Sequence, residues 1–179
     1  MKKIILAMFL LLTPMLAKAE IFGTASTLNP GVVMIGAEGE ALIDPNDIMA
    51  NFHIGYGLMD RFDMDMRFGA GSVPIYIGMD LEYQFIKDDL LDFSIIAGPH
   101  FQDETFLDFT PIVSHRFLRF SISTGFDFNY RVTNGTALGI SWFMGAAAPI
   151  TRGMDFLFDF GIRIKDAPHW VSAGVAIYI

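Results

Sequence analysis

The sequence lacks cysteine, is poor in basic residues, and has no apolar run of membrane-helix length after its first 19 residues. The absence of cysteine excludes a small secreted scaffold held together by disulfides. A formal net charge of −8 disfavours nucleic acid as a partner, because phosphates attract basic surfaces. A membrane-spanning helix needs about 20 consecutive apolar residues. If the chain enters a membrane, it must do so by other means.

The first 19 residues have the pattern of a secretory signal peptide. Two lysines give a basic start, an apolar stretch continues to Leu16, and Ala17-Lys18-Ala19 matches a small-residue cleavage site. We therefore expect the mature chain to begin at Glu20. Cleavage would remove three lysines and change the formal net charge from −8 to −11. The sequence thus predicts an exported protein that no helix anchors.

What the sequence has in abundance is alternation. In Phe120–Arg131, the even positions carry Phe, Ile, Thr, Phe, Phe and Tyr, and the odd positions carry Ser, Ser, Gly, Asp, Asn and Arg. A period of two is typical of a β-strand with one apolar and one polar face. Short segments rich in Asp, Asn, Gly and Pro separate the alternating stretches. The predicted strands are Val32–Ile43, Ile48–Leu58, Arg61–Gly71, Pro74–Ile86, Leu91–Gln102, Phe106–Arg116, Leu118–Val132, Thr136–Ile150, Met154–Lys165 and His169–Ile179.

The apolar face of these strands is too large for the inside of a small barrel. Hydrophobic residues make up 53% of the chain, so the apolar face should meet lipid and the polar face should line the interior. Closure would satisfy every backbone polar group within the membrane. The predicted fold class is all-β: a transmembrane antiparallel up-and-down β-barrel of about 10 strands, with 8 or 12 as alternatives.

The predicted organisation has three parts: a signal peptide over residues 1–19, an N-terminal tail over residues 20–31, and an outer-membrane β-barrel over residues 32–179. Asn29-Pro30-Gly31 ends the weak alternation of the tail, which leaves open whether the tail adds a strand. Pro99 and Pro111 are expected to form local bulges, because proline cannot donate to a strand ladder.

Two segments resemble small bacterial outer-membrane β-barrel proteins, the porin-like and OmpA-like barrel superfamily. Residues 171–179 alternate apolar side chains up to Ile179, where the family usually has an aromatic residue. Residues 57–65, Gly-Leu-Met-Asp-Arg-Phe-Asp-Met-Asp, are similar to a common strand–turn–strand unit of these proteins. The resemblance implies a location in the bacterial outer membrane, contact with outer-membrane lipids, and insertion by the barrel-insertion machinery through the C-terminal strand.

The polar face is rich in acidic residues. An acidic patch of the lumen is predicted from Glu38, Glu40, Asp63, Asp65, Asp80 and Glu82, and its basic partners from Arg61, Arg67, Arg131 and Arg163. A two-residue turn at Ser72-Val73 would place Asp65 opposite Asp80 and Asp63 opposite Glu82, with His53 beside Arg67. The patch could attract cations or hold a divalent ion. We favour a salt-bridge network that fills a narrow barrel.

His100 and Asp108 form a second candidate site, because the turn at Asp103-Glu104 could set them opposite each other near the outer rim. A His–Asp pair suits general-base chemistry, as in an outer-membrane enzyme that acts on lipid or peptide. However, the short loops build no substrate cleft and no serine accompanies His100. We therefore expect no enzyme, no cofactor and no metal site.

The function predicted from the sequence is an outer-membrane barrel protein, either structural or a narrow passive pore for small, preferentially cationic solutes. It should be monomeric and should not bind nucleic acid. Two alternatives stay open: an enzyme that uses His100 and Asp108, and a periplasmic β-sandwich binding module.

Overall fold

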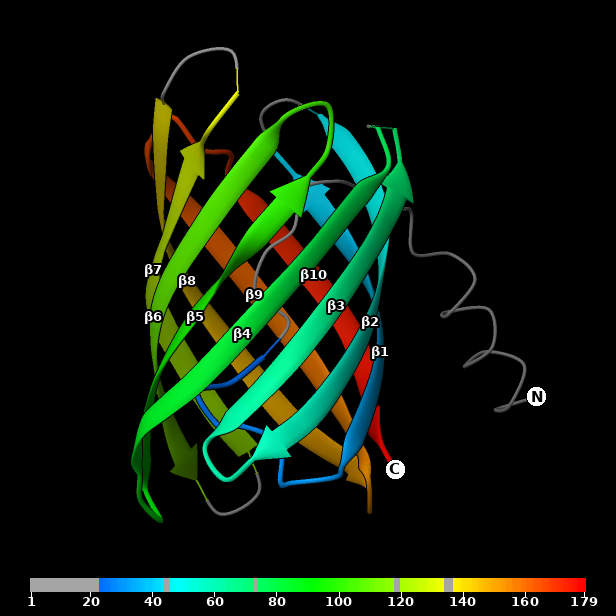
Figure 1. The fold of residues 1–179 in the computed structure, drawn as a ribbon. Coiled ribbons are helices and arrows are strands. Elements are labelled where there is room, and N and C mark those ends of the chain that lie inside the picture. Colours follow the sequence, from blue (N-terminus) through cyan, green and yellow to red (C-terminus); the bar gives the residue numbers. More distant parts are fainter. Residues whose placement is uncertain (1–22, 44–45, 73, 118–119, 134–136) are drawn as a thin grey trace, which may run out of the picture.

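In the computed structural model, ten antiparallel strands close into a barrel (Figure 1). The structure describes residues 23–43, 46–72, 74–117, 120–133 and 137–179. The strands are β1 (Val33–Leu42), β2 (Asp47–Met59), β3 (Phe62–Gly71), β4 (Tyr76–Lys87), β5 (Leu91–Phe101), β6 (Thr105–Phe117), β7 (Phe120–Arg131), β8 (Ala137–Thr151), β9 (Met154–Lys165) and β10 (Trp170–Tyr178). Each strand pairs with its sequence neighbours, and β1 also pairs with β10. Closure confirms the all-β barrel and excludes the sandwich.

The predicted strands are all present, and their ends differ from the observed ends by no more than two residues. Residues 23–31, the described part of the predicted tail, add no strand to the barrel. The predicted signal peptide, residues 1–19, lies outside the described residues. Ten strands, rather than eight or twelve, therefore make up the described barrel.

The apolar face points outward, as the alternation predicts. Along β2, Phe52, Ile54 and Tyr56 are 43%, 39% and 42% exposed. The alternate residues Asn51 and His53 are 2% and 0% exposed. The pattern is the reverse of a water-soluble barrel, which buries its apolar side chains. Among the described residues, no helix is long and apolar enough to cross a membrane.

The expectation of bulges at Pro99 and Pro111 is wrong. The register of β5 with β6 runs without a shift through both prolines. Each proline instead interrupts pairing on its other side: opposite Pro99 on β4, and opposite Pro111 on β7, while the register resumes unchanged beyond the gap. A missing N–H removes one ladder bond, and the strands on either side hold the register.

We use the term terminal end for the end of the barrel where β1 begins and β10 finishes. The β2–β3 turn at this end consists of Asp60 and Arg61, and Arg61 has a positive φ of 66°. Lys87 donates to Asp60 at 2.8 Å across the exposed rim, and this hydrogen bond lowers the pKa of Asp60. The turn takes Arg61 out of the strand alternation, so the prediction that Arg61 is a lumen residue is wrong. Its side chain is 43% exposed.

Candidate functional site in the barrel lumen

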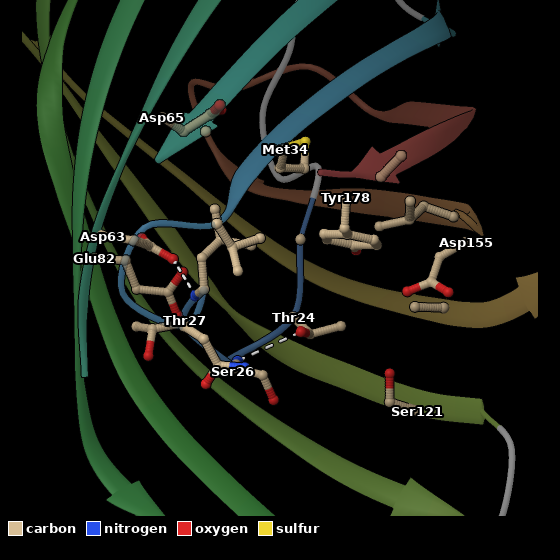
Figure 2. Close-up of a pocket in the computed structure, with 18 of the residues that line it drawn as sticks. Thr24, Ser26, Thr27, Met34, Asp63, Asp65, Glu82, Ser121, Asp155 and Tyr178 are labelled. Atoms are coloured by element: carbon tan, nitrogen blue, oxygen red, sulfur yellow. Dashed lines mark hydrogen bonds between the residues drawn. The ribbon is translucent and has the colours of Figure 1, made fainter. Parts of the chain in front are cut away.

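The terminal half of the lumen contains a cavity of about 810 Å³ (Figure 2). Asp63 and Glu82 line one side of it, from a register pair on β3 and β4, and Asp155 and Tyr178 line the other. Glu82 Oε1 is buried and has no hydrogen-bond partner in the described part of the chain. The cavity is therefore acidic, and it is polar enough to hold water or a cation.

The N-terminal tail lies inside this half of the lumen. We call residues 23–32 the tail segment. Six of its residues line the cavity together with the barrel wall: Gly23, Thr24, Ser26, Thr27, Leu28 and Asn29. Asn29, Pro30, Gly31 and Val32 then form a turn, in which Val32 N donates to Asn29 O at 3.0 Å and Gly31 has a φ of 82°. Proline followed by a positive-φ glycine is typical of a type II turn. This turn reverses the chain from the lumen into β1.

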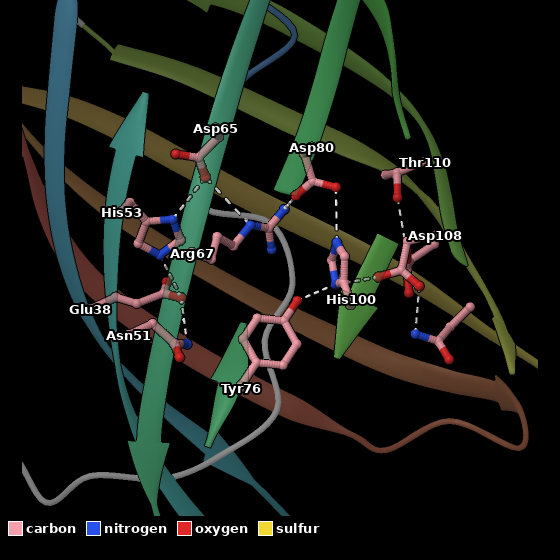
Figure 3. A network of polar contacts seen from close by, with 12 residues as sticks. Glu38, Asn51, His53, Asp65, Arg67, Tyr76, Asp80, His100, Asp108 and Thr110 are labelled. Carbon is pink, nitrogen blue, oxygen red and sulfur yellow. Dashed lines mark hydrogen bonds and ion pairs between the residues drawn. The ribbon is translucent and has the colours of Figure 1, made fainter. Parts of the chain in front are cut away.

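The middle of the lumen is crossed by a charged network of alternating acids and bases (Figure 3). Its members are Glu38, His53, Asp65, Arg67, Asp80, His100 and Asp108. They come from six consecutive strands, β1 to β6, and point into the lumen because each has the inward parity of its strand. The network thus ties one wall of the barrel together across its width.

Both imidazoles of the network lie between two carboxylates. His53 is 3.0 Å from Asp65 and 3.2 Å from Glu38. His100 is 2.9 Å from Asp80 and 2.8 Å from Asp108, and its Nδ1 also contacts the hydroxyl of Tyr76. Only an imidazolium can donate to carboxylates on both of its nitrogens. His53 therefore has the surroundings of a buried cation, whereas Nδ1 of His100 has both the Tyr76 hydroxyl and the Asp108 carboxylate within reach.

Arg67 joins the two histidine clusters. Its guanidinium contacts Asp80 and lies 3.5 Å from Asp65, so each of these carboxylates serves both the arginine and one histidine. The β3–β4 register pairs Asp65 with Asp80, as predicted from the turn at Ser72-Val73, and the β2–β3 register pairs His53 with Arg67, as also predicted. Shared carboxylates make the network continuous, with no acid or base in it isolated from the next.

Acids outnumber bases inside the barrel. Among the described residues, eight carboxylates are buried: Glu38, Glu40, Asp63, Asp80, Asp92, Asp108, Asp127 and Asp159. One guanidinium, Arg67, and two imidazoles, His53 and His100, are buried with them. The lumen is thus acidic even when both imidazoles carry charge. Buried uncompensated carboxylates are costly, so they favour a cation or a proton nearby.

Bulky side chains fill the lumen above the charged network, at the end opposite the termini. Leu42, Met49, Tyr76 and Trp170 lie at strand ends on this side, and each is at most 5% exposed. Phe143, from the middle of β8, is fully buried below them. Tyr76 and Phe143 were not predicted as lumen residues. The strand parity could have revealed them, because they share the inward parity of Gly78 and Gly145.

The wall formed by β7 to β10 carries small residues that make room for these side chains. A Cβ at Gly161 would overlap the indole of Trp170, and a Cβ at Gly145 would overlap the carboxylate of Asp159. Asp159 is 2% exposed, and its Oδ2 has no hydrogen-bond partner in the described part of the chain. The glycines therefore accept large side chains and do not open a gap.

The structure separates the predicted basic residues. Arg67 lies in the charged network with the acidic patch, and Arg61 lies in the rim turn. Arg131 pairs with Glu104 at 3.1 Å near the opposite rim, and Arg163 donates to the carbonyl of Ala167 beside the β9–β10 turn. Shared strand parity did not predict these partners, because Arg131 and Arg163 lie closer to the rim than the acidic patch does.

The predicted acidic patch is spread along the lumen. Glu38, Asp65 and Asp80 belong to the charged network. Glu40 shares the amide of Asn51 with Glu38, at 3.2 and 2.9 Å, and Asp63 and Glu82 line the cavity. In the described residues, no group of three or more His, Asp or Glu side chains is arranged to hold a metal ion.

The predicted His100–Asp108 pair is brought together, but away from any substrate. The two side chains are 2.8 Å apart, and the residues are 1% and 6% exposed. Tyr76 covers His100 on the side of the opposite rim (Figure 3). A base that solvent cannot reach has no route to a lipid or peptide substrate. The pair instead completes the charged network.

Comparison with protein-family models and with curated proteins finds no match. The fold is nevertheless shared with solved outer-membrane barrels. An outer membrane channel of the COG4313 group from Pseudomonas putida F1 superposes with a TM-score of 0.60 at 7% identity, covering 90% of this chain and 100% of that one. NanC porin gives 0.54 at 7% identity, covering 81% and 98%. KdgM porin gives 0.50 at 13% identity, covering 82% and 98%.

These similarities show the fold: a porin-like, outer-membrane type of β-barrel. Each of these three structures is described as a porin or a channel. At identities of 7% to 13%, they do not transfer a solute or a site to this chain. The function must therefore be argued from its own lumen.

Proposed function

We propose that this chain is a barrel of the bacterial outer membrane that conducts small cations through a narrow lumen, closed in the conformation described above. The observation that carries the proposal is the excess of buried carboxylates over buried bases in the lumen. A lumen lined by one sign of charge in a low-dielectric wall concentrates ions of the other sign. The outward apolar face and the shared fold support the membrane location.

Partner exchange in the charged network offers a way to open the lumen. Asp65 lies within reach of both His53 and Arg67, and Asp80 contacts both Arg67 and His100. A base that leaves one carboxylate therefore finds another close by. Such an exchange costs less than breaking an isolated buried ion pair, because no charge is left unpaired on the way. Because ions would pass only while the charged network rearranges, and not through a permanently open pore, the conductance would be low.

The lumen favours cations over acidic sugars. KdgM porin has been solved in complex with disordered oligogalacturonate, a polymer of carboxylate sugars. In this chain, Asp63, Glu82 and Asp155 line the cavity in the terminal half of the lumen, through which such a polymer would have to pass. Like charges repel in a confined site of low dielectric constant. The proposed solutes are thus small inorganic cations and small amines.

The enzyme alternative has less support. His100, its only candidate base, is 1% exposed and has carboxylates on both ring nitrogens. A general base must come within hydrogen-bond reach of its substrate. The main alternative to a channel is a purely structural role, which does not require the lumen to open.

Ion selectivity in planar bilayers tests the proposal. We expect the purified protein to give small current steps, and a reversal potential in a KCl gradient that shows preference for K⁺. The double variant Asp63→Asn, Asp155→Asn removes two carboxylates that line the cavity outside the charged network and should lower this preference several-fold. Asp103→Asn makes the same kind of change on an exposed turn and should leave the preference unaltered.

Two outcomes would contradict the proposal. Anion preference, or cation preference that the double variant does not change, would mean that the acids of the lumen do not control permeation. If the protein inserts but carries no current under any salt gradient, the channel proposal is rejected and the structural role is favoured.

A further inference from the structure

The tail segment is built into the lumen interior rather than lying loosely in it. Ala25 is fully buried and belongs to one apolar cluster with Ile96, Ile112 and Phe143. Thr27 is 8% exposed. Ala25 and Thr27 therefore lose nearly all contact with water, which requires that the barrel wall satisfy their polar groups.

The wall meets four successive tail residues with hydrogen bonds. Ala25 N donates to Ser114 Oγ at 2.6 Å, and Leu28 N donates to a carboxylate oxygen of Asp63 at 2.7 Å. Between them, the hydroxyl of Ser26 donates to Asp92, and Thr27 Oγ1 donates to Gln84 Oε1 at 2.9 Å. These contacts fix both the position and the direction of the segment along the wall.

The wall side chains that accept these hydrogen bonds are buried and are held in place by one another. Gln84, Asp92 and Ser114 come from β4, β5 and β6, and each is 0% exposed. Gln84 Nε2 also donates to Asp92 at 2.7 Å, which orients its oxygen toward the tail. Arg116 adds a hydrogen bond to the hydroxyl of Ser26 at 3.1 Å. Backbone and hydroxyl groups in register with wall acceptors and donors are typical of a site that binds an extended peptide.

We propose that these wall residues of β3 to β6 form a binding site for an extended peptide, and that the tail segment of the same chain fills it as a plug. The plug narrows the terminal half of the lumen to the acidic cavity beside it. Its effect on ion flow rests on the proposed channel function. The binding itself rests on the wall contacts alone.

Gly57 offers a way to loosen the plug without touching the wall site. Gly31 N donates to Gly57 O at 2.9 Å, and Gly57 N donates to Val32 O at 3.0 Å, where the tail turns into β1. A Cβ at position 57 would overlap the carbonyl of Asn29. This clash is with backbone, so the tail must move. Gly39, on the neighbouring strand β1, has open space around its Cβ position and supplies a matched control.

Thiol labelling measures the plug directly, because the chain has no cysteine of its own. Ser123, 1% exposed, has its hydroxyl 3.5 Å from Gly23 O and lies behind the tail. In Ser123→Cys protein folded in vesicles, a cationic methanethiosulfonate should react slowly. Adding Gly57→Ala should raise the rate about tenfold, because it weakens plug contacts worth about one or two hydrogen bonds. Adding Gly39→Ala should leave the rate unchanged.

A disulfide then tests the consequence for ion flow. The Ala25→Cys, Ser114→Cys protein should close the lumen when oxidised, and its conductance should rise when a reductant is added. Labelling rates that are equal in the parent, Gly57→Ala and Gly39→Ala backgrounds would overturn the plug, whatever the conductance. Faster labelling in Gly57→Ala, with no current in either redox state, would establish the plug and reject the channel.

Discussion

The two walls of the lumen differ in what they contribute. The wall of β1 to β6 supplies the charged network, with His53, Arg67 and His100 each held by two acids. The wall of β7 to β10 supplies glycine, alanine and serine at about half of its inward positions, and Phe143, Leu157 and Trp170 are among its bulky members. The charged wall holds all the buried bases among the described residues, whereas the small-residue wall adds the buried acids Asp127 and Asp159.

The glycines of the small-residue wall are covered by side chains of the same wall. Asp159 lies over Gly145, and Trp170 lies over Gly161. An inward glycine that a large side chain covers in this way becomes intolerant of substitution.

The largest effect should follow from removing the base at the centre of the charged wall. Arg67→Met leaves Asp65 and Asp80 without their shared guanidinium. We expect the free energy of unfolding to fall by about 3–5 kcal/mol, because a buried charge is left uncompensated. Guanidinium-induced unfolding of the barrel in vesicles, followed by circular dichroism, measures this change.

Two further variants separate charge from packing at this position. Adding Asp80→Asn to Arg67→Met should restore part of the loss, because it removes one of the two orphaned charges. Lys87→Gln breaks an exposed pair with Asp60 and should have a far smaller effect. If Arg67→Met unfolds no more readily than Lys87→Gln, the charged network does not stabilise the barrel.

An intermediate effect is expected from the small-residue wall. Gly161→Val places a side chain where the indole of Trp170 lies, so Trp170 must move. Overpacking of this kind costs about 1–3 kcal/mol of unfolding free energy. Gly39→Val, in open space on β1, is the control and should cost less. Equal losses in the two variants would mean that Trp170 is not held against Gly161.

The smallest effect is expected in the fluorescence of the two tryptophans, which lie on opposite faces of the barrel wall. Trp142 faces outward beside Phe160, at a ring-centroid distance of 5.8 Å, whereas Trp170 is 1% exposed inside the lumen. In Trp170→Phe protein, lipids with brominated acyl chains should quench the remaining fluorescence strongly. In Trp142→Phe protein, they should quench it weakly. Equal quenching would contradict either the membrane location or the inward position of Trp170.

Prediction from the sequence succeeded where a local repeat was sufficient. A period of two specifies which residues share a face, so Glu38, Asp65 and Asp80 could be assigned to the inside before any coordinates. It failed for Arg61, because a turn breaks the period, and for the two prolines, because neighbouring strands hold the register. The tail was missed as a plug, since its partners Gln84, Asp92 and Ser114 lie far away in sequence.

The sequence by itself determined the strands, their approximate ends and the direction of each face, because these follow from interactions between residues close along the chain. The tertiary structure alone decided which acids meet which bases, how high each residue lies in the barrel, and what fills the lumen. Those depend on the pairing of β1 with β10 and on the stagger of all ten strands around the barrel. Contacts across a closed lumen join positions that no local pattern relates.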